Sequence, residues 1–238
     1  MMFRRFLTMV GLVSAAAVAG FAGYILWLGI DDGQPSVCRG NAVYGSLENG
    51  RRLPYSGDNY RAYSFTLFAL GRTFVHSAIR DAMRDAYAEV YKSRPELRFV
   101  YAETGWPWGG RFAPHRTHAN GTSVDFHVPV RTPDGQVGEL PTSPLSLFGY
   151  AVRFDSNGRA GALSLDFEAM GEHLLALDKA ARAHRIRIRR VIFDVHLQPQ
   201  LAASQPGAMV MDRLRFNRRQ AWVPHSEHYH VDFDVPCR

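Results

Sequence analysis

The sequence has only two cysteines, Cys38 and Cys237, and neither lies within its two histidine-rich stretches. A structural zinc site of the cysteine type is therefore excluded there. One cysteine follows an apolar N-terminal stretch and the other is the penultimate residue. In an exported protein an isolated pair of this kind most simply forms a disulfide, which would join the start of the soluble region to its end. Two unpaired thiols are the alternative.

The chain also lacks basic residues interleaved with aromatic ones. Lysine and arginine outnumber acidic residues by 28 to 22, which gives a formal net charge of +6. The one dense basic run, residues 185–190, alternates with isoleucine. We therefore expect an anionic partner, such as a carboxylate-rich wall polymer or anionic lipid, and no nucleic acid. There is no internal repeat, and 238 residues suffice for one domain with a small appendage.

The N-terminus indicates export. Arg4 and Arg5 precede an uncharged apolar stretch over residues 6–30. This stretch is long enough to cross a bilayer as a helix and longer than the usual apolar part of a signal peptide. The arginines predict a cytoplasmic N-terminus with the remainder outside. We expect a transmembrane or signal segment (1–32) and a periplasmic domain (33–238), anchored in the inner membrane or secreted after cleavage.

Hydrophobic spacing predicts two helices among several strands. Residues 73–93 and 166–184 carry apolar side chains at intervals of three and four. Strands are expected at 97–103, 124–130, 186–195 (central in its sheet) and 228–235, and a hairpin at 150–163 around Asn157-Gly158. Irregular chain is expected at 33–62 and at 196–220, with a short helix in 196–220 as the alternative. The fold class is α+β, with a mostly antiparallel central sheet and flanking helices, preceded by one transmembrane or signal helix.

Six of the ten histidines fall in two short windows, residues 115–127 and 225–230. If the fold brings the windows together, His118, Asp125 and His230 supply two imidazoles and a carboxylate. That ligand set occurs in catalytic zinc sites, which keep one position open for water. The windows therefore predict a metal site, with chance clustering as the alternative.

Strand alternation decides which neighbours could share such a site. His228 and His230 are two residues apart, so they point to one face of an extended strand. Asp125 and His127 share a face for the same reason, which makes His127 a rival ligand. Arg111 could bind a substrate carboxylate through its bidentate guanidinium, or could be a surface residue without such a role.

At these residues the sequence resembles the penicillin-insensitive murein endopeptidases. They belong to a wider group of zinc peptidases with lysostaphin, the D-Ala-D-Ala metallopeptidases and the hedgehog signalling domain. The group's pattern is His-x6-Asp followed later by His-x-His, here His118 to Asp125 and His228 to His230. The endopeptidase branch adds further matches: Gly109-Gly110-Arg111, His115-Arg116-Thr117-His118, His225 and Cys237.

The resemblance is strong over residues 103–130 and 222–238 and only general between them. The chain departs from the branch in having fewer cysteines and in the strand end 231–233, which is less basic. The resemblance implies that one Zn²⁺ is bound by His118, Asp125 and His230. It further implies roles for residues beside the metal: His228 and His225 as base or oxyanion stabiliser, and Arg111 and His115 as substrate contacts.

Glu227 keeps the choice of base open. Residues 227–230 also satisfy the Glu-x-x-His of the dipeptidase and carboxypeptidase branch, in which the glutamate is the base. On a regular strand Glu227 and His228 face opposite ways, so a bulge would decide between them. The remaining spacings follow the endopeptidase branch, which favours His228.

The expected function is that of an exported zinc metallopeptidase acting on peptidoglycan. The expected target is the cross-link between D-Ala and meso-diaminopimelate in stem peptides. One alternative is a D,D-carboxypeptidase that trims free stem peptides. The other is a catalytically degenerate module that binds the wall.

Overall fold

The computed structural model describes residues 2–238, apart from the side chains of residues 2–12, 15 and 26. It separates into two compact units, 1–34 and 35–238. The first contains α1 (Met2–Leu28). Among the described residues, no helix is both long and apolar enough to cross a membrane. The expected span over residues 6–30 lies partly outside the described side chains, so it stays a prediction.

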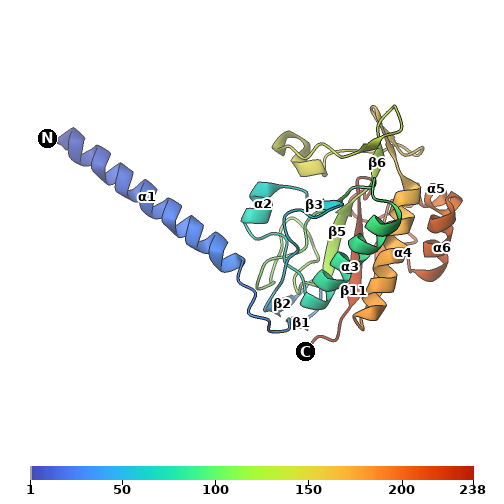
Figure 1. Cartoon of the computed structure of the whole chain (residues 1–238), viewed down its shortest axis with the longest axis horizontal. Helices are drawn as coiled ribbons and strands as arrows, with labels where there is room; N and C mark the ends of the chain where they lie inside the picture. Colours follow the sequence, from blue (N-terminus) through green and yellow to red (C-terminus); the bar gives the residue numbers. More distant parts are fainter. Residues whose placement is uncertain (1) are drawn as a thin grey trace. The chain divides into compact units, whose positions relative to one another are not determined.

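A five-stranded sheet organises the second unit (Figure 1). Its order is β10-β11-β5-β4-β3, and neighbours are antiparallel apart from the parallel pair β3 and β4. The strands are β3 (Tyr60–Ala62), β4 (Phe99–Tyr101), β5 (Ser123–His127), β10 (Arg187–Ile192) and β11 (His228–Asp234). There are two smaller sheets among the described residues. One pairs β1 (Val37–Gly40) with β2 (Gly45–Glu48). The other has the strand order β7 (Val137–Gly138), β6 (Val130–Arg131), β9 (Leu163–Leu165) and β8 (Arg159–Ala160). The fold is α+β, as predicted.

Two long helices cover one face of the sheet (Figure 1). They are α3 (Ser77–Ser93) and α4 (Phe167–Ala183), and α4 begins where the Asp166 side chain accepts from the Ala169 amide. Their apolar stripes pack on the inward side chains of β5 and β11, which include Val124, Phe126 and Val231. The shorter helices are α2 (Phe65–Ala69), the 3-10 turn η1 (Pro144–Gly149), α5 (Gln198–Ala203) and α6 (Gln205–Arg213).

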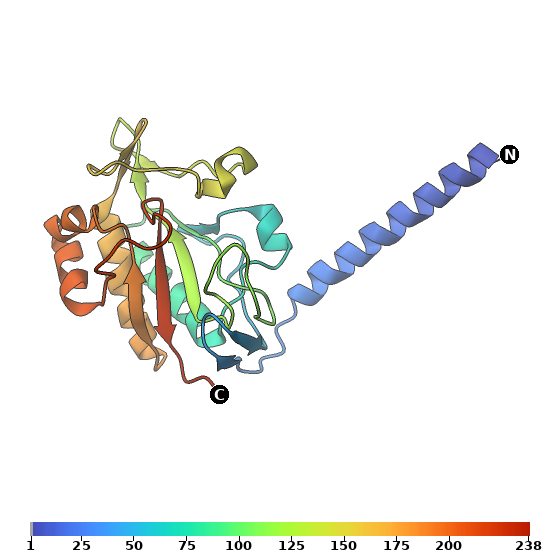
Figure 2. The ribbon, with the colours of Figure 1, turned by 180° about the vertical axis from the view of Figure 1, so that it is seen from behind.

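Figure 2 shows the sheet from its other side, with β11 in front of the two long helices. Because successive side chains alternate across a strand, His228, His230 and Asp232 of β11 point to this side, away from the helices. His230 pairs with Asp125 in the register of β11 and β5. The fold therefore brings the two histidine-rich windows together at the centre of the sheet.

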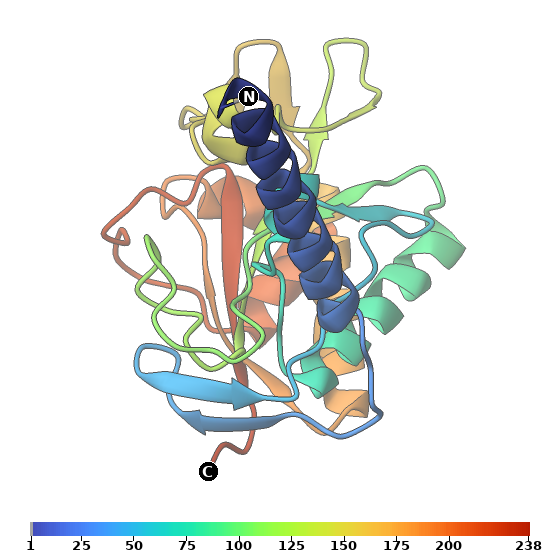
Figure 3. The ribbon, with the colours of Figure 1, turned by 90° about the vertical axis from the view of Figure 1, so that its left-hand side faces the viewer.

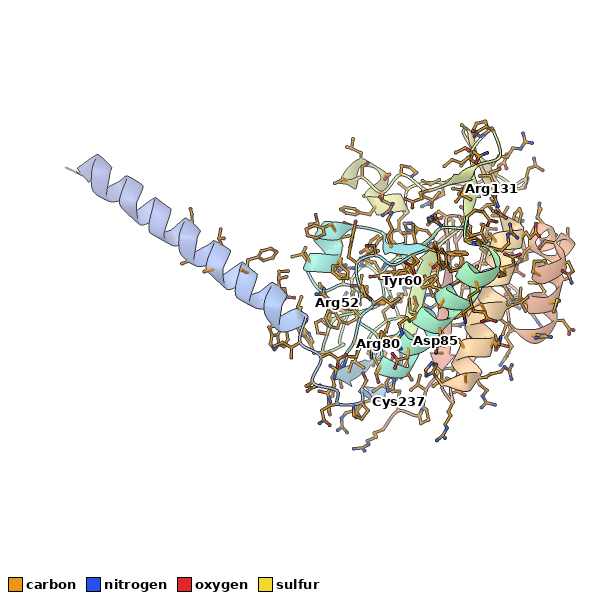
Figure 4. The ribbon with its side chains drawn as sticks, in the orientation of Figure 1. Arg52, Tyr60, Arg80, Asp85, Arg131 and Cys237 are labelled. Carbon is orange, nitrogen blue, oxygen red and sulfur yellow. A yellow bond between two sulfur atoms is a disulfide. The ribbon has the colours of Figure 1, made fainter. Side chains whose placement is uncertain are left out.

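A disulfide joins the two ends of the second unit, as the sequence predicts. Cys38 on β1 is bonded to Cys237, 199 residues further along the chain. The hairpin β1–β2 and the C-terminus lie at the same end of the unit (Figures 3 and 4). Backbone hydrogen bonds flank the disulfide, from Gly40 to Arg238 and from Arg238 to Cys38. Closing a loop this long restricts the unfolded chain and so stabilises the folded state by a free energy on the order of 4 kcal/mol.

Two of the expected elements are wrong. Residues 150–154 form no strand, and β8 instead pairs with β9 across Gly161. The reason is local: the Asp155 carboxylate accepts from the backbone amides of Asn157 and Arg159 and closes a tight turn. In addition, β10 is an edge strand and not a central one.

The edge strand β10 has the sequence of a central strand, and at Val191 its outer side is also hydrogen-bonded to another segment. The segment 215–217 runs beside Val191, with hydrogen bonds of 2.9 Å and 3.1 Å to its backbone. The segments expected to be irregular also contain regular structure. Residues 33–62 hold β1, β2 and β3. Residues 196–220 hold two short helices, α5 and α6, so the alternative of a short helix there is the correct one.

Candidate metal and catalytic site

A cavity of about 900 Å³ lies against the polar face of the central sheet. One wall is the loop of residues 103–117, which follows β4. A second wall is η1 with Tyr150, and the third is the segment 217–225 that leads into β11. The floor is formed by the polar side chains of β5 and β11. The cavity is thus built where both histidine-rich windows meet.

His118 is fixed in one tautomer by the backbone. Its Nδ1 lies 3.1 Å from the carbonyl of Thr104 and 3.2 Å from that of Ser123. Carbonyl oxygens only accept, so Nδ1 carries the proton and Nε2 keeps its lone pair. The ring is fully buried, and among the described residues Nε2 has no hydrogen-bond partner. Burial lowers the pKa of His118, which keeps the ring neutral and able to bind a metal.

Asp125 is the point at which the site residues meet. Its Oδ1 lies 3.4 Å from Nε2 of His118 and 2.8 Å from Nδ1 of His230. The Tyr150 hydroxyl donates to Oδ2 over 3.0 Å. Burial raises the pKa of the Asp125 carboxyl, but the neighbouring histidines outweigh it and hold the pKa well below its usual range. The carboxylate therefore stays ionised in a fully buried position.

His230 lies between two carboxylates. Its Nδ1 contacts Asp125, and its Nε2 lies 2.8 Å from Oδ1 of Asp232. Asp232 is itself held by Ser123 Oγ at 2.7 Å and by Arg190 at 2.5 Å. Burial lowers the pKa of His230, yet Asp232 and Asp125 together raise it to about 10. A carboxylate behind Nε2 is also the usual way of orienting a histidine whose other nitrogen binds a metal.

His115 lies closer to this centre than expected of a substrate contact. Ligand atoms of His115, His118 and Asp125 all lie within 4.8 Å of one another, so this group could hold a metal ion. Nδ1 of His115 is 3.5 Å from Asp125 Oδ2, and Nε2 is 2.5 Å from Oε2 of Glu103. His115 is therefore a second candidate, beside His230, for the third ligand.

The three candidate catalytic residues lie beside this group. The rings of His225 and His228 are 4.5 Å apart, and Nε2 of His228 is 3.9 Å from Oδ2 of Asp125. Burial, followed by the neighbouring His228, lowers the pKa of His225 to about 3. Nδ1 of His228 lies 3.1 Å from Oε1 of Glu227, whose other oxygen pairs with Arg153 at 3.2 Å. Glu227 thus contacts the imidazole of His228, the other candidate for the catalytic base.

Two sequence candidates lie outside the group. Arg111 is exposed and is not among the residues that line the cavity. The rival ligand His127 packs its ring against Tyr63 and Tyr150, at centroid distances of 6.1 Å and 5.6 Å. Within the described residues neither of its ring nitrogens has a hydrogen-bond partner. Burial lowers the pKa of His127 to about 3.

Sequence reasoning missed Glu103, Tyr150 and Asp232. Glu103 is buried and accepts from the Tyr63 hydroxyl at 2.8 Å, from Arg72 and from His115. Burial raises the pKa of Glu103, but hydrogen bonds from His115 and Arg72 lower it to about 2. Asp232 could have been found, since alternation places it on the face of His228 and His230. No local pattern marks Tyr150 or Glu103.

No protein-family model matches the chain, and a search of characterised proteins finds no match either. The chemistry of the cavity is therefore argued from its own residues. It brings together neutral and charged imidazoles, an ionised buried carboxylate and a histidine–glutamate pair. Such a set can bind a cation, hold a water and move a proton.

Proposed function

We propose that the protein is a zinc-dependent hydrolase of peptidoglycan that cleaves the cross-link between D-Ala and meso-diaminopimelate. The observation that carries the proposal is the orientation of His118. Two carbonyls accept from its Nδ1–H, and its buried Nε2, directed toward Asp125, has no hydrogen-bond partner within the described part of the chain. An orphaned nitrogen beside a carboxylate and a second imidazole fits the nitrogen and oxygen ligands that zinc prefers.

His118, Asp125 and His230 would hold the ion, with His115 as the alternative third ligand. When bound there, zinc would polarise the scissile carbonyl and lower the pKa of a water molecule to about 7. The chain supports this set through its surroundings. The carboxylate of Asp232 orients His230 through Nε2, which leaves Nδ1 directed at the site.

His228 is the proposed base. Glu227 accepts a hydrogen bond from Nδ1–H of His228. The Nε2 atom of His228 therefore keeps its lone pair and can take a proton from the attacking water. The carboxylate then stabilises the imidazolium that forms, and His228 passes the proton to the leaving amine. Burial lowers the pKa of His225 and keeps its ring neutral beside His228. Its Nδ1 lies 2.8 Å from the Val223 carbonyl and can donate only to this carbonyl. Its role is to pack against and position His228.

Peptidoglycan is proposed as the substrate because of the motif spacing in residues 103–130 and 222–238 and the positive charge of the chain. The cavity is large enough for a peptide segment. The disulfide suits an oxidising compartment, which is compatible with the periplasm. A membrane anchor over residues 6–30 would confine cutting to the inner layers of the wall.

The test uses purified protein on cross-linked peptidoglycan, with products identified by mass spectrometry. We expect dimers to be converted to monomers, with the reaction stopped by a chelator, restored by zinc and absent in His118→Ala. Loss of terminal D-Ala from intact dimers would instead identify a carboxypeptidase. No product from protein that holds zinc would contradict the proposal and leave a wall-binding module.

A further inference from the structure

Five arginines line the cavity, and they differ in their partners. They are Arg72, Arg116, Arg153, Arg190 and Arg219. Three of them are paired with carboxylates of the site: Arg72 with Glu103, Arg153 with Glu227, and Arg190 with Asp232. Among the described residues, no carboxylate pairs with Arg116 or Arg219, although both line the same cavity. These two guanidinium groups are therefore available to pair with an anionic group of a ligand.

Arg116 is held in place by an aromatic ring from another wall. It lies on the loop of residues 103–117, whereas Trp222 lies on the segment 217–225. The Cζ atom of Arg116 is 4.4 Å from the centroid of the Trp222 ring. Both side chains are exposed, Trp222 by 60%. A contact through the π face fixes the guanidinium without supplying a hydrogen-bond acceptor for its N–H groups.

The distribution of negative charge limits where an anion can bind. The floor of the cavity holds Asp125, and Glu103 and Glu227 stand at its sides, while Asp232 lies behind His230. Glu103, Glu227 and Asp232 are already paired with arginines, and Asp125 would bind the proposed metal ion, so the charges of the site are balanced within it. Among the described residues, Arg116 and Arg219 at the exposed rim are the cavity-lining arginines without a carboxylate partner. An anionic group of a bound peptide is therefore favoured at this rim.

We propose that Arg116, stacked on Trp222 and assisted by Arg219, binds a carboxylate of the peptide substrate, an inference that rests on the proposed function. Stem peptides carry such groups on D-glutamate and on diaminopimelate. The guanidinium fork matches a carboxylate bidentately and loses this match when the carboxylate is amidated. The rim thus makes the protein specific for non-amidated peptides.

The test measures equilibrium binding of the tripeptide L-Ala-γ-D-Glu-meso-diaminopimelate, which lacks the bond to be cut. Two further ligands carry one carboxamide each, at D-Glu or at diaminopimelate. We expect one of these amidations to weaken binding about tenfold, and Arg116→Ala to weaken binding of the free tripeptide equally. Arg116→Ala should bind that amidated ligand no more weakly than the free one. Arg218→Ala is the matched control, since Arg218 is exposed beside Arg219 but does not line the cavity.

The outcomes separate this inference from the proposed function. Cleavage of cross-linked dimers with no dependence on either carboxylate, or on Arg116, would overturn the inference and leave the activity intact. The opposite result is carboxylate-dependent binding that Arg116→Ala abolishes, together with no cleavage by the zinc-loaded protein. It would support carboxylate binding by Arg116 and refute the proposed hydrolase activity. In cleavage assays the loss in Arg116→Ala should appear in KM and not in kcat, with Trp222→Ala giving a smaller change in the same direction.

Discussion

His230 and Asp125 are 105 residues apart in the chain, yet they face each other across β11 and β5 with their side chains 2.8 Å apart. The contact follows from the antiparallel register of the two central strands. A shift of that register by one residue would turn one of the two side chains toward the helices. The sheet core under Val124 and Val231 therefore fixes the site geometry as firmly as the polar contacts do.

We predict that His118→Ala abolishes zinc binding and that His127→Gln does not. The Nε2 atom of His118 is directed at Asp125, whereas the ring of His127 packs against aromatic side chains beside the site. Zinc per protein, measured by elemental analysis after dialysis, should fall from about one to near zero in the first variant only. Retention of zinc in His118→Ala would remove the central ligand from the assignment.

The third ligand can be decided by a paired comparison of His230→Ala and His115→Ala. We predict that His230→Ala loses zinc, because Asp232 orients its ring toward the site. We expect His115→Ala to keep zinc, because Glu103 already holds its Nε2 and about a fifth of the side chain is exposed (18%). The reverse pattern of zinc content would assign the metal to the group His115, His118 and Asp125.

His173 predicts a pH dependence of stability away from the site. It is fully buried on α4, with Nδ1 2.8 Å from the Tyr229 hydroxyl, and burial lowers its pKa to about 3. In the unfolded chain its pKa is about 6.5. Below pH 6.5 His173 therefore binds a proton in the unfolded state but not in the folded state. The free energy of unfolding falls as the pH falls from 6.5 toward 3.

His173→Gln keeps an acceptor for Tyr229 and removes this titration. At pH 4.5 the wild type should lose roughly 2–3 kcal/mol through His173 relative to pH 7, and the variant should not. Urea unfolding at both pH values, with chelator present so that metal binding does not contribute, measures the difference. Equal losses in the two proteins would mean that His173 is not held neutral.

The disulfide predicts a loss of stability without loss of the site. Replacing both Cys38 and Cys237 by serine should lower the free energy of unfolding by about 2–5 kcal/mol. Neither cysteine lines the cavity, so zinc content at low temperature should stay near one. Thermal unfolding and elemental analysis on the same samples check both statements. A variant that loses its zinc while still folded would show that the disulfide also positions the site.

The sequence predicts helices and strands best where the spacing is set by one buried face. The stripe from Met170 to Leu177 gave α4 to within one residue at either end, because tertiary packing agrees with the local pattern. Alternation likewise gave β11 and the shared face of His228 and His230. The predicted hairpin around Asn157-Gly158 is wrong because the Asp155 carboxylate accepts hydrogen bonds from the backbone amides of Asn157 and Arg159, which closes a turn at this point.

The two histidine-rich windows of the candidate site could be predicted from the sequence, whereas the residues that surround and orient them could not. His118, Asp125 and His230 meet as their spacing suggested. Glu103 ends the predicted strand 97–103 and Tyr150 begins the predicted hairpin 150–163, but neither pattern indicates that these side chains contact Asp125 and His115. Long-range convergence of this kind depends on the path of the loops, which local propensity does not determine.

Glu227 and His228 give the most decisive kinetic prediction. If Glu227 acts through His228, then Glu227→Gln lowers kcat about 10- to 1,000-fold by leaving the imidazolium without its carboxylate, with zinc content unchanged. His228→Ala should be at least as severe, and the double variant should be no worse than His228→Ala, because the two residues then form one unit. If Glu227 is itself the base, Glu227→Gln is the more damaging single change, and His228→Ala retains the greater share of turnover. Single-turnover rates of the three zinc-loaded variants on one cross-linked dimer decide between these patterns.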